Sequence, residues 1–349
     1  MSKVHCFTSA TFAYLDRVRI LGATIRKYHP DWTFTFCLSD EQPEGFHFDA
    51  EQEPFDRLVH ISDLPIENLR SWMFEHDIVE LCTAVKGVVL CEILSGGADK
   101  VVYLDPDIAI FSPLEEVVRG LDLYDVILTP HQIDPDTKTS AIIDNEIGSL
   151  KHGIFNLGFV AVANTADGVR FAKWWRDRLI QFCFDDIAGG LFTDQKWCDH
   201  APVFFPNTHI LRHRGYNVAS WNLSQRPVSF GQDGSVLAGG EPIRFFHFTK
   251  VNWVGEAMLE RYSGDRIEVF ELMQWYRDLL SQNSARGLPE RWWAYGSFAD
   301  GDTITKNHRL AYRHSATLKA DYPNPYVLQF SVLEQFKAKL ERRYSELFT

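Results

Sequence analysis

The sequence predicts an α/β fold, with a mixed sheet flanked by helices and a helical C-terminal extension. Short apolar runs alternate with helix-like stretches through the first half of the chain. This rhythm is typical of a mostly parallel sheet with helices on both faces. After about residue 256, amphipathic helical spacing dominates instead. The 349 residues can form one large α/β domain with an appended region.

The first half begins with a short apolar strand at residues 4–9. The pattern then predicts, in order, a helix at 14–28, a strand at 32–38, a surface loop at 41–56, a strand at 58–61, a helix at 78–94 and a buried strand at 101–104. Gly96 and Gly97 end the second helix. The last strand leads directly into Asp105-Pro106-Asp107, so two carboxylates follow its end.

The second half is mixed. The pattern predicts strands at 124–129 and 154–163, a helix at 166–184, and short strands and loops through 202–205, 216–223 and 243–248. The spacing of Ile267, Phe270, Met273, Trp275 and Leu279 predicts an amphipathic helix. An aromatic-rich segment at 291–296 and a terminal surface helix at 333–347 complete the chain. No internal repeat or low-complexity tract interrupts it.

The composition limits the classes of partner. The net charge of −12 argues against a nucleic-acid binder, which normally carries a basic excess. An anionic small molecule stays open, because a bound divalent cation can reverse the local charge. Aromatic residues make up 14% of the chain, which indicates a large core.

The cysteines and the lengths of the apolar runs indicate the cellular compartment. None of the six cysteines forms a CxxC pair, so we expect reduced, structural thiols and a cytoplasmic protein. The N-terminus runs straight into a strand pattern, so no signal peptide is expected. No apolar run approaches ~18 residues, so no transmembrane helix is expected.

The acidic pair Asp105 and Asp107 is the main candidate for chemistry. Carboxylates that follow a buried strand converge at the carboxyl edge of the sheet, where open α/β sheets bind ligands. Their hard oxygen atoms suit Mg²⁺ or Mn²⁺, which in turn hold substrate phosphates. The apolar runs on both sides strengthen this interpretation, because two acids there are costly unless they are paired or bound to metal.

The acidic pair has three other interpretations. A calcium loop starting at Asp105 needs an oxygen ligand and a glycine where Ala109 and Ile110 stand. A phosphatase of the haloacid-dehalogenase type needs a threonine at the position of Ala109. A plain turn, with Asp107 capping backbone donors, stays open on the motif alone.

Four further segments follow the acidic pair along the chain. With Lys100–Asp107 they make five in order, namely Lys100–Asp107, Phe155-Asn156-Leu157-Gly158-Phe159, Thr193-Asp194-Gln195, Trp221-Asn222 and Phe246-His247-Phe248-Thr249-Lys250. These five segments, in this order, resemble the motifs of GT-A-type glycosyltransferases, most of all the glycogenin-like and bacterial lipopolysaccharide galactosyl- and glucosyltransferases of family 8. The resemblance covers roughly residues 1–255. It implies a catalytic domain at 1–255 and a mainly helical extension at 256–349 that packs on it.

The resemblance implies a role for each segment. Asp105, Asp107 and His247 hold Mn²⁺ or Mg²⁺, which bridges the two phosphates of a nucleotide sugar. Asn156 and Asp194 face the donor sugar. Lys86 and Lys250 are candidates to neutralise phosphate oxygens.

The exit of the first strand is assigned to the nucleotide. Thr8, Ser9 and Ala10 are small enough to let the base and ribose approach, and Asp40, which follows the second strand, is a further uridine or ribose contact.

Each of these residues also has an ordinary structural interpretation. Lys86 could extend its ammonium group to solvent from an apolar helix. His247, between two phenylalanines, could be a hydrogen-bonded core histidine. Asp194 could cap a helix that opens at Gln195, and Asn156 could belong to a plain strand edge.

The chain also departs from the family pattern. Pro106 stands between the acids where many relatives carry Ser or Ala, which stiffens the turn without changing the carboxylates. No glycine separates His247 from Lys250, which weakens the phosphate role of Lys250. The segment 292–296 has no counterpart in the family core; we expect it to pack on the catalytic domain and to shape the acceptor site.

The expected reaction is transfer of a hexose from a nucleoside diphosphate sugar, a UDP-sugar, to a hydroxyl group of a glycan or lipid-linked glycan. The resemblance implies retention of the anomeric configuration. A sugar nucleotidyltransferase is the second enzyme hypothesis, but residues 8–14 lack the glycine-rich, basic loop that such enzymes carry. A nucleotide-sugar-binding protein without turnover is the third hypothesis. Basic residues near the C-terminus are diluted by glutamates, which favours a solvated helix over peripheral membrane contact.

Overall fold

The computed structural model describes residues 2–251 and 254–347 and contains a seven-stranded central sheet. The strand order is β10-β6-β7-β4-β1-β2-β3, and β7 is the strand that runs antiparallel to both of its neighbours. These strands are β1 (Val4–Ala10), β2 (Thr33–Leu38), β3 (Arg57–His60), β4 (Lys100–Leu104), β6 (Val126–Pro130), β7 (Phe155–Ala163) and β10 (Thr208–Ile210). The predicted mixed, mostly parallel sheet is therefore confirmed.

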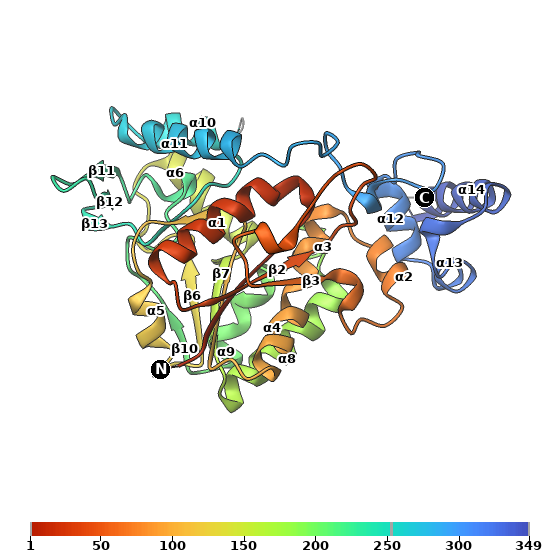
Figure 1. Ribbon diagram of the computed structural model, residues 1–349, viewed down its shortest axis with the longest axis horizontal. Coiled ribbons are helices and arrows are strands. Elements are labelled where there is room, and N and C mark those ends of the chain that lie inside the picture. Colours follow the sequence, from red (N-terminus) through yellow and green to blue (C-terminus); the bar gives the residue numbers. More distant parts are fainter. Residues whose placement is uncertain (1, 252–253, 348–349) are drawn as a thin grey trace.

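Helices cover both faces of this sheet (Figure 1). The helices of this region are α1 (Leu15–Tyr28), α2 (Leu69–Phe74), α3 (Ile78–Ala84), α4 (Lys86–Ser95), α5 (Glu115–Gly120), α6 (Thr139–Ala141), α7 (Ile147–His152), α8 (Ala166–Phe182) and α9 (Ala201–Phe204). Alternate residues of a strand point to opposite faces of the sheet. Phe7 and Tyr103 therefore pack with α3, α4 and α8, whereas Cys6 and Leu104 pack with α1 and α5.

Two predicted elements differ from the structure. The single helix expected at 78–94 is divided at Val85 into α3 and α4. Residues 202–205 were expected among short strands and loops, but 201–204 form the helix α9. Pro202 lies in its first turn, where its fixed φ angle favours a helix start and its missing N–H is not needed.

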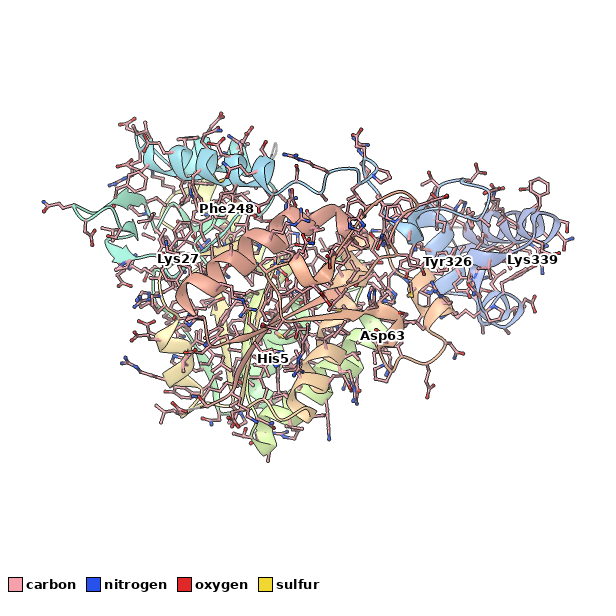
Figure 2. The ribbon with its side chains drawn as sticks, in the orientation of Figure 1. His5, Lys27, Asp63, Phe248, Tyr326 and Lys339 are labelled. Atoms are coloured by element: carbon pink, nitrogen blue, oxygen red, sulfur yellow. The ribbon has the colours of Figure 1, made fainter. Side chains whose placement is uncertain are left out.

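Short antiparallel pairs extend from the carboxyl edge of the sheet. The strand β5 (Ile108–Ile110), directly after the acidic pair, pairs with β14 (Phe245–His247). The other short strands are β8 (Asp185–Asp186), β9 (Leu191–Phe192), β11 (Val228–Phe230), β12 (Val236–Ala238) and β13 (Glu241–Pro242). Next in the chain, the ring of Phe248 stacks on Tyr276 at 3.9 Å, beneath the helix α11 (Figure 2).

The remaining helices form two groups at opposite ends of the molecule (Figure 1). The first group, α10 (Val254–Tyr262) and α11 (Glu268–Gln282), lies near β11, β12 and β13. The second group is α12 (Lys306–Arg313), α13 (Ala316–Asp321) and α14 (Phe330–Leu347). The predicted amphipathic and terminal helices correspond to α11 and α14. The division of the chain at residue 255 stays a prediction.

Two arginines, the buried Arg309 and the half-buried Arg313, attach the second group to α2 and α3. Arg309 donates to the carbonyl groups of Phe74 and His76 at the end of α2. Arg313 donates to Glu80 of α3 at 2.9 Å. Because Arg309 is buried and Arg313 pairs with the buried Glu80, these contacts hold the α12–α14 group against the segment that carries α2 and α3.

All six cysteines are free thiols. Across the described ranges, no helix has both the length and the apolar content that a membrane crossing requires.

Candidate functional site

Asp105, Asp107 and His247 meet at the carboxyl edge of the central sheet. The chain turns immediately after β4, where the N–H of Ile108 donates to the carbonyl of Asp105, and β5 then pairs with β14. This pairing places His247 Nε2 at 3.0 Å from Asp107 Oδ1 and 3.6 Å from Asp105 Oδ2. One ligand atom from each residue lies within 4.8 Å of the others. Two carboxylates and an imidazole at this spacing fit a divalent cation such as Mn²⁺ or Mg²⁺.

The position of His247 depends on a glycine in β7. A Cβ atom added to Gly158 would lie 2.5 Å from Cε1 of His247 and 2.8 Å from its Nδ1. The carbonyl of the same glycine accepts the N–H of Asp105 at 2.8 Å. Gly158 therefore positions two members of the cluster, because it leaves room for the imidazole of His247 and its carbonyl holds the backbone of Asp105.

The electrostatics of the cluster favour the charged forms of Asp107 and His247. Burial opposes charge on both groups, but their attraction outweighs it. The pKa of Asp107 is lowered, and the pKa of His247 is raised. A cation bound here would replace the proton of His247 as the partner of the two acids.

Lys86 lies at the start of α4 and points into the same site. Its side chain is 3% exposed, and its Nζ lies 2.9 Å from Asp194 Oδ2 and 3.2 Å from Asp105 Oδ1. Burial opposes its charge, but the two carboxylates raise the pKa of Lys86 well above its usual value. The snorkelling interpretation is therefore wrong, and the lysine is a fixed buried cation that joins the cluster to Asp194.

Asn156 and Asp194 lie beside this pair. Asp194 accepts from Lys86 and from the hydroxyl of Thr193, and its side chain is 4% exposed. Asn156 Oδ1 accepts from Gly158 N–H at 3.2 Å and from Asn217 Nδ2 at 3.0 Å. Gln195 connects the two segments, because its Oε1 accepts the backbone N–H of Leu157 at 3.2 Å. The predicted catalytic residues are thus adjacent in space, although 38 positions separate Asn156 from Asp194.

A cavity of about 310 Å³ opens over these residues. The side chains that line it include the three cluster residues, Lys86, Asn156 and Asp194, together with Asp77, Glu80, Thr83, Asp185, Phe192, Gln195, Trp221 and Thr249. Its size falls in the range of small-ligand sites, roughly 300–1,000 Å³. Trp221 packs edge-on against the His247 ring at 5.3 Å and forms part of the wall.

The strand residues assigned to the nucleotide lie apart from this cavity. Thr8, Ser9 and Ala10 are buried at the end of β1, and they are not among the described residues that line the cavity. The hydroxyl of Ser9 donates to the carbonyl of Cys82, which ties β1 to α3. Their contact with a base or ribose stays a prediction.

Asp40 has a structural environment that the sequence does not reveal. Its carboxylate accepts three backbone N–H groups, from Phe12 at 3.2 Å, Glu41 at 2.9 Å and Ala294 at 2.8 Å. Burial raises the pKa of Asp40 to about 7 in spite of these bonds. The residue therefore joins the segments that follow β1 and β2 to the C-terminal segment, and its ribose contact stays a prediction.

Lys250 lies outside the cavity lining. Its side chain is exposed, and its backbone has a left-handed φ of 49°. The neighbouring Thr249 lines the cavity instead. The predicted phosphate contact of Lys250 has no geometric support among the described residues.

Sequence reasoning missed the wall formed by Asp77 and Glu80. These residues form a reciprocal capping box at the start of α3, and Glu80 also accepts the N–H of Asp185 at 2.8 Å. An acidic residue followed three positions later by glutamate, before an apolar run, is a readable helix-start signal. The partner of Glu80, Arg313, is 233 positions away and only the tertiary structure identifies it.

Comparison with known proteins gives distant similarities. No family model matches the chain. The Bacillus subtilis (strain 168) proteins YfnD and YfnF, both described as uncharacterized, are 24% and 26% identical to it. The YfnD match covers 86% of this chain and 95% of YfnD, whereas the YfnF match covers 55% of this chain and only 63% of YfnF.

Among solved structures, the galactosyltransferase LgtC in complex with donor and acceptor sugar analogues matches 83% of this chain and 98% of its own, with 14% identity and a TM-score of 0.42. The apo-form glycosyltransferase GlyE of Streptococcus pneumoniae TIGR4 matches 80% of this chain and 64% of its own, with 14% identity and a TM-score of 0.43.

Proposed function

We propose that this chain is a metal-dependent glycosyltransferase. It moves a hexose from a nucleoside diphosphate sugar, a UDP-sugar, to a hydroxyl group of a glycan or lipid-linked glycan. The anomeric configuration of the hexose is retained. The observation that carries the proposal is the cluster of Asp105, Asp107 and His247 at the carboxyl edge of the sheet, beneath a cavity that also exposes Asn156 and Asp194. Ligands of open α/β sheets bind at this edge.

The metal-binding cluster and the residues beside it would contact different parts of a bound donor. Asp105, Asp107 and His247 would hold Mn²⁺ or Mg²⁺, which supplies Lewis-acid stabilisation of a departing diphosphate. Lys86 keeps Asp105 and Asp194 at fixed positions through its two ion pairs. Asn156 presents an amide group and Asp194 a carboxylate at the cavity wall, and both suit the hydroxyl groups of a hexose.

The buried surroundings strengthen these interactions. The side chain of His247 is 5% exposed and that of Asp194 is 4% exposed, so a donor bound in the cavity meets few competing waters. Charge that develops on the leaving phosphate is therefore stabilised by groups that are already oriented.

A donor screen tests the proposal. Purified protein with Mn²⁺ is incubated with UDP-, GDP- and dTDP-hexoses, and release of the nucleoside diphosphate is measured. We expect UDP release from a UDP-hexose, loss of release on chelation of the metal, and at least a hundred-fold loss in Asp107→Ala. The matched control is Asp31→Ala, an exposed carboxylate at the opposite edge of the sheet, which should behave as wild type.

Two outcomes contradict the proposal. Turnover by Asp107→Ala that is independent of metal would remove the metal-dependent mechanism. Calorimetric binding of the UDP-hexose without any product, in the presence of acceptor glycans, would favour a nucleotide-sugar-binding protein.

A further inference from the structure

A second pocket, of about 520 Å³, lies where the segment after β2 meets the C-terminal part of the chain. It shares no lining residue with the cavity over Asp105 among the described residues. Arg70 of α2 lines the second pocket, whereas Asp77 and Glu80 at the start of α3 line the first. Figure 2 labels Tyr326 in this region, beside the C-terminal helices.

Aromatic rings form one wall of the second pocket. Trp293 lies edge-on to Tyr295 at 6.3 Å, and Tyr295 lies 5.4 Å from Tyr326. Trp292 and Trp293 use their indole N–H groups internally, on the carbonyls of Glu41 and Ser39. Both rings are half-buried, so their carbon surfaces line the pocket without leaving a polar atom unpaired there.

A strained turn presents the two tryptophans. The N–H of Trp292 donates to the carbonyl of Pro289, and Arg291 inside this turn has a left-handed φ of 56°. A residue with a Cβ atom is disfavoured in that conformation by roughly 1–2 kcal/mol. Strained backbone of this kind concentrates at ligand sites, because the surrounding structure has to hold it in place.

The rim of the pocket carries balanced charge. Glu41 and Arg70 form an ion pair at 2.8 Å with both side chains partly exposed, and Glu290 and Arg291 are exposed nearby. Two acids and two bases leave no net charge to attract an anion or a cation. A carboxylate beside a guanidinium instead offers an acceptor and a set of donors to neighbouring hydroxyl groups.

We propose that this aromatic pocket binds a neutral carbohydrate, a hexose unit of the glycan acceptor at a distance from the site of transfer. The flat C–H face of a pyranose packs on the half-buried rings of Trp292 and Trp293, while its hydroxyl edge bonds Glu41 and Arg70. This inference rests on the proposed glycosyl transfer for the identity of the glycan as acceptor, but the binding itself requires neither donor nor metal.

The test measures binding alone. Saturation-transfer NMR and calorimetry are run on the full chain, without nucleotide or metal, with maltotetraose, cellotetraose and chitotetraose as probes. We expect at least one probe to bind, and Trp292→Ala and Arg70→Ala each to weaken binding about five- to ten-fold. Arg70 is a surface residue, so its variant remains informative even where Trp292→Ala fails to fold.

Matched controls separate this pocket from the donor site. Trp275→Ala removes an exposed tryptophan of α11 that does not line this pocket, and should bind as wild type. Asp107→Ala should lose donor hydrolysis but keep glycan binding. Absence of binding to all three tetrasaccharides, or equal binding by wild type, Trp292→Ala and Arg70→Ala, overturns the inference. Absence of UDP release by the wild-type protein, with glycan binding intact, would instead count against the proposed function.

Discussion

Replacement of Gly158 by alanine tests the geometry of the site most directly. The added Cβ would lie 2.5 Å from Cε1 of His247, 2.8 Å from its Nδ1 and 2.8 Å from Asn156 Oδ1. Because carbon atoms in contact are separated by at least about 3.5 Å, the imidazole has to move by roughly 1 Å. His247 Nε2 then leaves its position 3.0 Å from Asp107.

The expected magnitude follows from this displacement. A misplacement of about 1 Å at a reacting centre can lower the rate about a hundred-fold, whereas overpacking costs about 1–3 kcal/mol of stability. We therefore expect Gly158→Ala to remain folded, to bind Mn²⁺ more weakly and to release UDP about a hundred-fold more slowly. Calorimetric Mn²⁺ titration, UDP release and thermal unfolding measure the three quantities separately.

Gly148 provides the matched control. It lies in α7, and a Cβ atom added there meets nothing within 4 Å. Gly148→Ala should keep full activity and gain up to about 1 kcal/mol of stability, because alanine favours the helix more than glycine does. The reasoning is refuted if Gly158→Ala binds Mn²⁺ and turns over like wild type, since His247 would then not depend on that space.

Two other perturbations have definite signs. Lys86→Met leaves the carboxylate of Asp194 buried without its counter-charge, so we expect a loss of about 3–5 kcal/mol in unfolding free energy. Adding Asp194→Asn should restore much of that stability but none of the UDP release. An unchanged denaturation midpoint in Lys86→Met would contradict the pairing. His29 accepts the N–H of Leu114 at 3.0 Å through Nε2, and burial lowers the pKa of His29 from 6.5 to about 4. The unfolded chain binds this proton first, so the stabilisation is complete above pH 6.5 and falls by about 3 kcal/mol as the pH approaches 4. His29→Gln keeps an acceptor that does not titrate, and urea unfolding at pH 7 and pH 4.5 should show a smaller loss than in wild type; an equal loss would assign the acid sensitivity to other groups.

The aromatic segment near the C-terminus lines the second pocket and also contacts the end of β2. Ala294 donates to Asp40, and Trp293 donates to the carbonyl of Ser39, so the segment closes over the end of β2. The expectation that 292–296 packs on the sheet domain agrees with these contacts. Its effect on the acceptor belongs to the proposed carbohydrate pocket.

The local elements could be predicted because short-range patterns determine them. The apolar runs at β1, β2, β4 and β7 and the helical spacing of α1, α8 and α11 are visible in one dimension, since side-chain periodicity follows from backbone geometry. The acidic pair was located in the same way, because it directly follows a buried strand. The short helix α9 was not predicted, because four residues are too few to show helical periodicity.

The site itself depends on contacts between distant segments. The pairing of β5 with β14 brings His247 to Asp107, and Lys86 reaches Asp194 across 108 positions. The capping role of Asp40 and the attachment of Glu80 to Arg313 likewise depend on segments separated by more than 200 residues. Local patterns in the sequence identify which residues carry suitable chemistry and place the two acids directly after a buried strand. Only the tertiary structure decided which of them share a cavity, because long-range packing and the burial of charge, rather than local backbone preference, select those neighbours.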